Sequence, residues 1–264
     1  MLIDINTYIG HWPFRQLRDN TCKDILNRMN EVGIDQSIVS NLNGIFYKDV
    51  HSANEELFEA IRASGKKSDR LVPLAVINPI YSGWKNDFKV ATERFGMKGI
   101  RLHPQYHGYD LTHENCVTLV KMARDKGLPV MFSLRMVDSR PSSWMDISKE
   151  WALKDIMPII KAVPDAKYAI VNVANNSQLN VYNKDEMELF RNTDLVMDTS
   201  GRMILNLGEM LRTYGTDKFA FGTHAPLLDH ITGLLRIESL RPEEASLQDK
   251  ILLNAGNAKR IFSI

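Results

Sequence analysis

Short apolar runs alternate with amphipathic helical patterns along the chain, and this alternation limits the possible folds more than any other feature. Eight runs rich in β-branched residues predict strands, at residues 2–8, 36–40, 71–78, 98–103, 129–135, 168–173, 195–200 and 219–224. Most of these runs are continuously apolar, which is typical of parallel strands covered by helices on both faces. Apolar residues at helical spacing lie between the runs, as in Leu153, Ile156, Met157 and Ile160. The sequence therefore predicts an α/β protein with a parallel sheet.

The number of strands separates the two main parallel architectures. Eight strands in 264 residues leave about 33 residues for each strand and its helix, the size of one βα repeat. A doubly wound sheet would place a glycine-rich turn after its first strand, but residues 6–10 contain a single glycine, Gly10. No linker rich in Pro, Gly or Ser divides the chain. We therefore predict one domain, residues 1–264, folded as a single (β/α)8 TIM barrel, with loops over its active face at residues 41–50 and 136–147.

Composition excludes several classes of partner. The chain has 33 Lys and Arg against 32 Asp and Glu, a net charge of +1 without long runs of either sign, so we expect no nucleic-acid or membrane partner. The longest apolar stretch, residues 71–80, is far shorter than the roughly 20 residues of a membrane-spanning helix. Two cysteines form no disulfide framework, and the first predicted strand leaves no room for a signal peptide. We expect a cytoplasmic protein, and a homodimer through the outer helices stays open.

Polar residues stand at the end of nearly every predicted strand. In a barrel the carboxyl ends of the strands surround the active face. We therefore predict a site at one mouth of the barrel. Its candidate residues at the strand ends are Asn6, Tyr8, Ser40, Asn78, Arg101, His103, Ser133, Arg135, Asn172, Asp198, Ser200, Thr223 and His224.

Arginines are prominent among these candidates. Arg101 and Arg135 end neighbouring strands, and Arg15 and Arg140 follow the first and fifth strands. Because a guanidinium binds carboxylate or phosphate through two parallel hydrogen bonds, we expect a small anionic substrate. The alternative is that some of these arginines brace loops by pairing with an aspartate. The aspartates available for such pairs are Asp110, Asp138 and Asp198. We also expect Trp12 and Trp144 to lie beside the site.

Eight short segments carry a family resemblance through their order and spacing. They are residues 3–10 (IDINTYIG), 12–15 (WPFR), 98–104 (KGIRLHP), 106–109 (YHGY), 127–130 (GLPV), 198–201 (DTSG), 221–226 (FGTHAP) and 256–262 (GNAKRIF). Together they resemble the amidohydrolase-related (amidohydrolase 2) family of TIM-barrel metal-dependent hydrolases, lactonases and decarboxylases. The resemblance covers almost the whole chain, and it implies a barrel enzyme acting on a small molecule.

The resemblance also implies a divalent metal, yet this chain departs from the family's pattern at all five ligand positions. The His-x-His of the first strand corresponds to Asn6 and Tyr8. The histidines of the fifth and sixth strands correspond to Ser133 and Asn172, and the aspartate of the eighth strand corresponds to His224. Asn, Tyr and Ser are poor zinc ligands. We therefore expect a divergent member of the family without a cofactor.

A zinc site with rearranged ligands is the alternative to this expectation. Three imidazoles would bind zinc well, and four histidines could lie around the mouth. They are His11, His103, His107 and His224. His103 could instead be a hydrogen-bonded residue that packs the turn against Pro104.

Without a metal, the residues of the mouth must supply both positive charge and a base. His224 is the candidate base because an imidazole titrates near neutral pH. Arg101 and Arg135 would bind a substrate carboxylate and a developing oxyanion. Tyr8 and Asn6 would donate hydrogen bonds to the same oxygen, and His103 is a further catalytic candidate. The remaining substrate-binding candidates are Arg15, Asp138, Arg140, Asn172, Asp198, Trp12 and Trp144.

These assignments suggest a metal-independent, lactonase-like hydrolase acting on a small carboxylated compound such as a sugar derivative. A lactone is an activated ester, whereas an amide would require polarisation by a metal. Two alternatives stay open. One is a non-catalytic ligand-binding barrel that has lost its metal site. The other is a metal-dependent hydrolase or decarboxylase with rearranged ligands.

Overall fold

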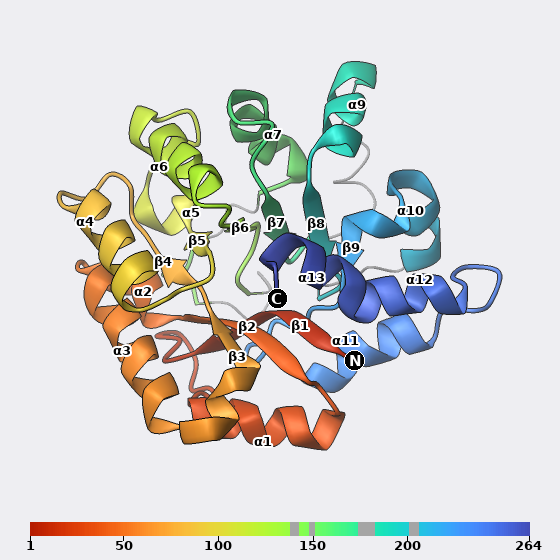
Figure 1. The fold of residues 1–264 in the computed structure, drawn as a ribbon, viewed down its shortest axis with the longest axis horizontal. Coiled ribbons are helices and arrows are strands. Elements are labelled where there is room, and N and C mark those ends of the chain that lie inside the picture. The colour runs from red at the N-terminus through yellow and green to blue at the C-terminus, as the bar shows by residue number, and fades with distance from the viewer. Residues whose placement is uncertain (138–142, 148–150, 174–182, 201–205) are drawn as a thin grey trace.

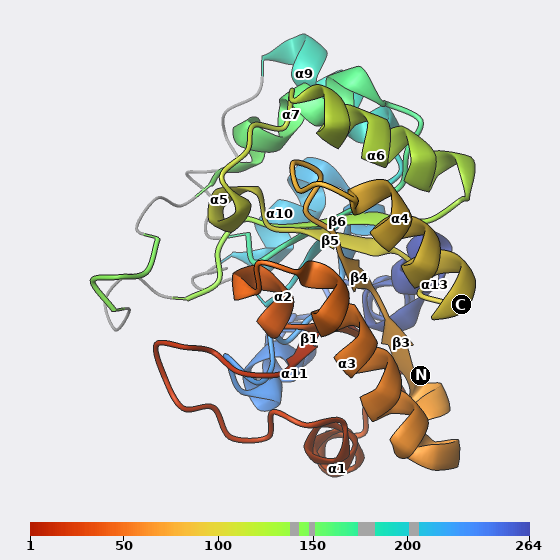
Figure 2. The ribbon, with the colours of Figure 1, turned by 90° about the vertical axis from the view of Figure 1, so that its left-hand side faces the viewer.

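The computed structural model describes residues 1–137, 143–147, 151–173, 183–200 and 206–264, which form a closed ring of parallel strands surrounded by helices (Figures 1 and 2). The strands are β1 (Ile3–Ile9), β2 (Gln36–Asn41), β3 (Leu71–Pro73), β4 (Ala75–Val76), β5 (Ile100–Leu102), β6 (Val130–Ser133), β7 (Tyr168–Val171), β8 (Leu195–Asp198) and β9 (Phe219–Ala220). The helices are α1 (Cys22–Val32), α2 (Asn43–Phe46), α3 (Val50–Ala63), α4 (Trp84–Lys89), α5 (Pro104–His107), α6 (Glu114–Asp125), α7 (Leu153–Ala162), α9 (Lys184–Asn192), α10 (Leu207–Tyr214), α11 (His230–Glu238), α12 (Leu247–Ile251) and α13 (Asn257–Phe262).

Parallel pairing follows the order of the strands in the chain. Each strand pairs with the next in the chain, from β1 through β3 in one sheet and from β4 through β9 in a second sheet. Leu74 N donates to Val39 O at 2.9 Å and connects the two sheets. The predicted strand at residues 71–78 is therefore split into β3 and β4, because the chain changes its pairing partner at Leu74.

A seam between the first and last strands closes the ring. Ile5 N donates to Phe221 O at 2.9 Å, and Tyr8 N donates to Ala225 O at 2.8 Å. Thr7 and Ala225 form a parallel bridge at the same place. Since residues 71–76 act as one interrupted strand, the ring has eight strands, and the predicted (β/α)8 barrel is confirmed.

The interior of the barrel on the side away from the carboxyl ends of the strands is an apolar core. Inward side chains such as Ile3, Ile38 and Val196 pack in one buried cluster with Ile261 and Phe262 of α13. Figure 1 shows α13 lying across the centre of the ring. A second cluster lies between the strands and the outer helices and includes Ile25 and Met29 of α1. Helix α13 therefore closes the end of the barrel opposite the carboxyl ends of the strands.

Local sequence signals explain where the helices begin and end. Thr21 and Asp24 form a capping box at the start of α1, and Gly33 ends it with a φ of 80°, a left-handed conformation that suits glycine. The apolar spacing at residues 153–160 does form a helix, α7. The prediction of a loop at residues 41–50 was wrong in part, because residues 43–46 form α2 and α3 begins at Val50 behind its cap, Asp49.

Two expectations from composition can be compared with the structure. Cys22 and Cys116 are both buried free cysteines. Among the helices that the structure describes, none is long and apolar enough to cross a bilayer. The cellular compartment and the homodimer stay predictions.

Candidate functional site

The carboxyl ends of the strands bring eight polar side chains together across the barrel. Each of them is at most 4% exposed. We call this group the mouth cluster. Its members are Asn6, Tyr8, Arg101, Ser133, Asn172, Asp198, Ser200 and His224.

Asn6 on β1 is the centre of the mouth cluster. Its Oδ1 accepts a hydrogen bond from Arg101 Nη2 at 2.6 Å. Its Nδ2 donates to Asp198 Oδ2 at 2.6 Å and to Ser200 Oγ at 3.0 Å. One carboxamide therefore connects the cationic and the anionic side of the cluster, and these bonds fix its orientation.

Asp198 is a fully buried carboxylate at the end of β8. Besides Asn6, it accepts hydrogen bonds from the backbone N of Asn172, at 2.6 Å, and from the Ser200 hydroxyl. Burial raises the pKa of Asp198, and these donors only partly oppose the shift. A Cβ at Gly222 would stand 2.8 Å from Asp198 Cβ. Only glycine therefore allows this approach between β8 and the chain after β9.

Arg101 on β5 is the cation of the mouth cluster, and its exposure is 0%. Its Nε and Nη2 donate to Ser133 Oγ at 3.1 and 3.0 Å, and its guanidinium carbon lies 3.8 Å from the centre of the Tyr8 ring. Burial lowers the pKa of Arg101, against the opposing effects of Tyr8 and Asp198. Its Nη1 has no hydrogen-bond partner among the described residues. A buried guanidinium with a free donor is suited to an oxyanion.

Tyr8 and Ser133 continue this network toward the loop after β6. The Tyr8 hydroxyl lies 3.2 Å from Ser133 Oγ and donates to the sulfur of Met136 at 3.3 Å. Burial raises the pKa of Tyr8, although the charge of Arg101 opposes the shift. Tyr8 is therefore a protonated phenol that can donate a hydrogen bond.

His224 follows β9, with a φ of 61°. Its Nε2 lies 2.6 Å from Met136 O, and since a carbonyl only accepts, we assign the ring proton to Nε2. Its Nδ1 then accepts from Asn6 Nδ2 at 3.2 Å. Burial lowers the pKa of His224 to about 3, and the charges of Arg101, Arg135 and Arg15 act in the same direction. The ring is thus neutral at ordinary pH, with both nitrogens engaged.

His103 differs from His224 in that its ring makes no hydrogen bond within the described chain. It is 1% exposed, and neither ring nitrogen has a partner there. Its ring centre lies 6.5 Å from that of Tyr8 and 6.2 Å from that of His107. Burial lowers its pKa well below the usual range. A buried imidazole without partners next to Arg101 is a second polar group available to a ligand.

Arg135 and Trp12 are predicted site residues outside the mouth cluster, although Asn172 connects the cluster to Arg135. Asn172 donates to Arg135 O at 2.7 Å, and Arg135 Nε donates to Val137 O at 2.7 Å, so this guanidinium bends back toward the loop after β6. Trp12 is buried among Phe14, Phe46 and Tyr106.

Two further predicted residues, Trp144 and Arg15, do not lie in the mouth cluster. The structure leaves Trp144 outside it, because the side chain is 92% exposed. Arg15 lies on the loop after β1 and donates to Leu227 O at 2.9 Å. Asp138 and Arg140 lie outside the described residues.

Sequence reasoning missed one buried acid below the mouth cluster. Asp4 on β1 accepts hydrogen bonds from the backbone nitrogens of Asn6 and Thr223, both at 3.0 Å, and from the Thr223 hydroxyl at 2.5 Å. Burial raises its pKa to about 7. The register of β1 shifts between Asp4 and Thr7, so strand alternation alone does not place this side chain. A carboxylate inside the otherwise apolar run of residues 2–5 is the signal that could have identified it.

A divalent metal does not fit the described part of the mouth. Within those residues no three His, Cys, Asp or Glu side chains could hold one ion. The Asn6 oxygen at the first-strand position is already bonded to the Arg101 guanidinium, whose charge repels a cation. His11, His103, His107 and His224 form no such group here. The expectation that the chain needs no cofactor stays a prediction.

No family model matches the chain, and no curated protein does. Solved structures do match over the whole length. One is a putative amidohydrolase from Staphylococcus aureus, with a TM-score of 0.75 and 12% identity over 100% of this chain and 99% of that chain. Another is a dihydroxybenzoic acid decarboxylase from Polaromonas with bound manganese and an inhibitor, with a TM-score of 0.70 and 13% identity over 99% of this chain and 96% of that chain. A third is a probable 2-pyrone-4,6-dicarboxylic acid hydrolase from Acinetobacter baumannii with citric acid bound, with a TM-score of 0.63 and 13% identity over 100% of this chain and 99% of that chain.

At 12% and 13% identity these likenesses show the fold alone. The chain has the (β/α)8 barrel fold of these amidohydrolase-like proteins. This agrees with the resemblance seen in the sequence at the level of the fold. The proposed loss of the metal ligands is a separate claim and stays a prediction.

Proposed function

We propose that this chain is a hydrolase of small carboxylated compounds that opens a lactone or a similarly activated ester, with the charge of Arg101 taking the place of a bound metal. The observation that carries the proposal is the fully buried Arg101 with an unfilled donor at Nη1. A buried cation costs free energy unless something pairs with it. A substrate carboxylate or a developing oxyanion would supply that partner.

Hydrolysis in this site would proceed by attack of water on the lactone carbonyl. The carbon–oxygen bond to the water forms, a side chain accepts the water proton, and the charge collects on the carbonyl oxygen. Arg101 and the Tyr8 hydroxyl would stabilise that oxyanion. The ring oxygen then leaves with a proton, and the product is a hydroxy acid. The anionic product and substrate agree with the acids named for two of the similar structures.

Two residues are candidates for the proton acceptor. His224 is the first, because a substrate anion beside its ring would raise its low pKa. Asp198 is the second, because burial raises its pKa and strengthens it as a base. Asn6 contacts both, through Nδ2. The two candidates differ in the pH dependence that they would give to the rate.

A panel of lactones with and without carboxylate groups tests the proposal, using chelator-treated protein. The parent should hydrolyse a carboxylated lactone, and Arg101→Met should abolish most of this activity, whereas the surface variant Arg62→Met should retain it. If His224 is the base, His224→Ala should be inactive and the parent rate should be flat above about pH 5. If Asp198 is the base, the rate should fall as the pH drops through its raised pKa. Turnover that requires added Mn²⁺ or Zn²⁺ would contradict the proposal.

A non-catalytic binding barrel is the second candidate, and His224 favours it. Both nitrogens of this ring are engaged, and its pKa of about 3 makes it a weak base without substrate. Such a barrel would bind small carboxylates, with Arg101 required, and would show no turnover. A metal-dependent decarboxylase with other ligands is the remaining alternative, and it would need ligands beyond the described residues.

A further inference from the structure

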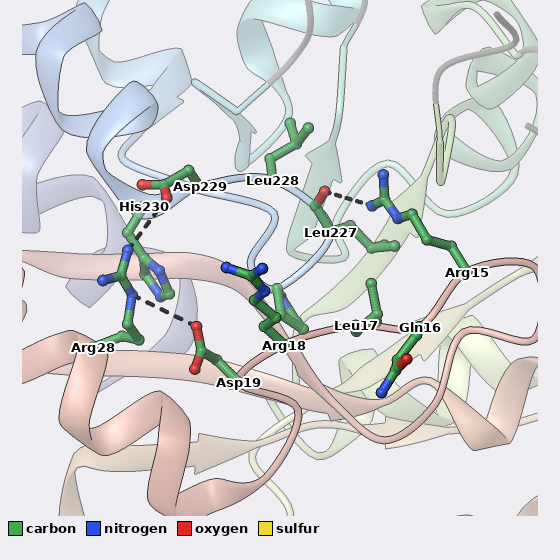
Figure 3. Close-up of a pocket in the computed structure, with 11 residues that line it drawn as sticks. Arg15, Gln16, Leu17, Arg18, Asp19, Arg28, Leu227, Leu228, Asp229 and His230 are labelled. Carbon is green, nitrogen blue, oxygen red and sulfur yellow. Dashed lines mark hydrogen bonds and ion pairs between the residues drawn. The ribbon is translucent and has the colours of Figure 1, made fainter. Parts of the chain in front are cut away.

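A second charged cavity lies outside the mouth cluster, between the loop after β1 and the start of α11 (Figure 3). Its volume is about 520 Å³, within the range typical of small-molecule sites. Apolar parts of Leu17 and Leu227 contribute to its wall. We call it the arginine cavity, because three of the polar residues that line it are arginines: Arg15, Arg18 and Arg28, together with Asp19, Asp229 and His230.

Arg28 pairs with the carboxylates near this cavity. It contacts Glu31 at 2.5 Å, Asp229 at 3.2 Å and Asp19 at 3.8 Å. Figure 3 shows Asp19 and Asp229 on either side of its guanidinium. Because both lining carboxylates already face Arg28, they do not occupy the other two arginines.

Arg15 and Arg18 keep most of their donors available. Arg15 uses Nη2 for Leu227 O at 2.9 Å, and Arg18 forms no ion pair or hydrogen bond with the rest of the described chain. Both residues line the same cavity. Two planar guanidiniums with free N–H groups match the oxygens of a carboxylate or phosphate.

His230 supplies an independent sign of a ligand. It is the first residue of α11 and is only 3% exposed, yet its Nε2 has no hydrogen-bond partner within the described residues. Figure 3 shows its ring beside Arg28, turned toward the side of Arg18. Burial lowers its pKa to about 4, so the ring is neutral at pH 7. A neutral imidazole with an unpaired nitrogen can donate to an oxyanion.

We propose that the arginine cavity binds a small oxyanion, a phosphate group or a carboxylate, as a site separate from the mouth cluster. Arg15 and Arg18 would hold the anion, His230 would contribute a hydrogen bond, and Arg28 would keep Asp19 and Asp229 turned away from it. The cavity then serves an effector or a second anionic molecule. This proposal does not depend on the reaction proposed for the mouth.

The test measures binding of inorganic phosphate and of malonate by calorimetry and by thermal shift at constant ionic strength. At least one of the two should bind saturably, and their relative affinities identify the phosphate or the carboxylate source. Arg18→Gln should weaken binding by about tenfold, the loss expected for one charge-assisted pair. His230→Phe should weaken it as well. Arg241→Gln is the matched control on another exposed arginine with acidic neighbours and should bind as the parent does.

Two further outcomes separate this proposal from the proposed function. Arg101→Met should bind the anion as tightly as the parent, even if it has lost turnover. Loss of binding in Arg101→Met with retention in Arg18→Gln would place the anion in the mouth and overturn the proposal. Absence of saturable binding by both probes up to about 20 mM, well above the millimolar range of weak sites, would also overturn it.

Discussion

The mouth cluster and the arginine cavity both present arginine, but in opposite environments. Arg101 is 0% exposed and is fixed by Asn6 and Ser133, whereas Arg18 is exposed on a loop. Charges interact far more strongly inside a protein than in water. A buried, fixed guanidinium can therefore stabilise charge that develops during a reaction, and an exposed one is suited to binding. The surroundings of an arginine therefore decide what it can do.

Substitution of Arg101 should produce the largest difference between the two regions. Arg101→Met should reduce lactone turnover by about 100-fold or more, the usual loss on removing one donor to an oxyanion. Steady-state kinetics of this variant and of Arg18→Gln give the measurement. Arg18→Gln should retain the parent turnover, and equal losses in both variants would mean that the two regions act as one site.

Gly222 tests how tightly the mouth cluster is packed. In Gly222→Ala the new Cβ would lie 2.9 Å from Asp198 Oδ2, so Asp198 or the chain after β9 must move. We expect a loss of about 1–3 kcal/mol in the free energy of unfolding, as for other overpacked cores, together with reduced turnover. Denaturant unfolding followed by fluorescence measures it. An unchanged midpoint would show that the cluster is looser than the structure indicates.

Two buried groups near the barrel centre, Asp4 and His224, should change the free energy of unfolding with pH in opposite directions. Asp4, with its pKa raised from 3.8 to about 7, contributes stability that is complete below about pH 4 and is lost as the pH rises to 7. His224, with its pKa lowered from 6.5 to about 3, contributes stability that is complete above about pH 6.5 and is lost as the pH falls. Relative to the parent, Asp4→Asn should therefore gain stability as the pH rises, and His224→Gln should gain it as the pH falls.

The size of each slope is limited by one proton, which is about 1.4 kcal/mol per pH unit. Urea titrations of the parent and both variants between pH 4 and 7 measure the difference. Subtracting the parent's free energy of unfolding from that of each variant at the same pH removes the contribution of the other groups that titrate in this range. Slopes of the same sign in the two variants would contradict the assignment.

The smallest effect is expected when a residue of the arginine cavity is replaced and the stability of the protein is measured without ligand. Arg18→Gln should change the free energy of unfolding by less than about 0.5 kcal/mol, as is usual for exposed side chains without partners. Thermal unfolding without added anion provides the measurement. A clear loss of stability would show that Arg18 has a structural role, and would weaken its assignment to an anion.

Much of the barrel could be predicted from the sequence, because continuous apolar runs and helical spacing report which residues are buried. The strand ends Asn6, Arg101 and Asp198 were predicted at one mouth on the same grounds. Their mutual bonds were not predicted, since contacts across a barrel depend on strand tilt and on side-chain length. The arginine cavity was missed because Arg28 and His230 belong to helices whose sequences give no sign that they meet the loop after β1.

The seam that closes the ring runs through the mouth itself. His224 N donates to Asn6 O at 2.8 Å, next to the side-chain contact between the same two residues. The contacts that close the ring and those that assemble the site therefore involve the same two residues. A partly unfolded chain that releases only its last strand would keep most of its secondary structure and yet have no working centre, so inactivation should precede any large loss of circular dichroism.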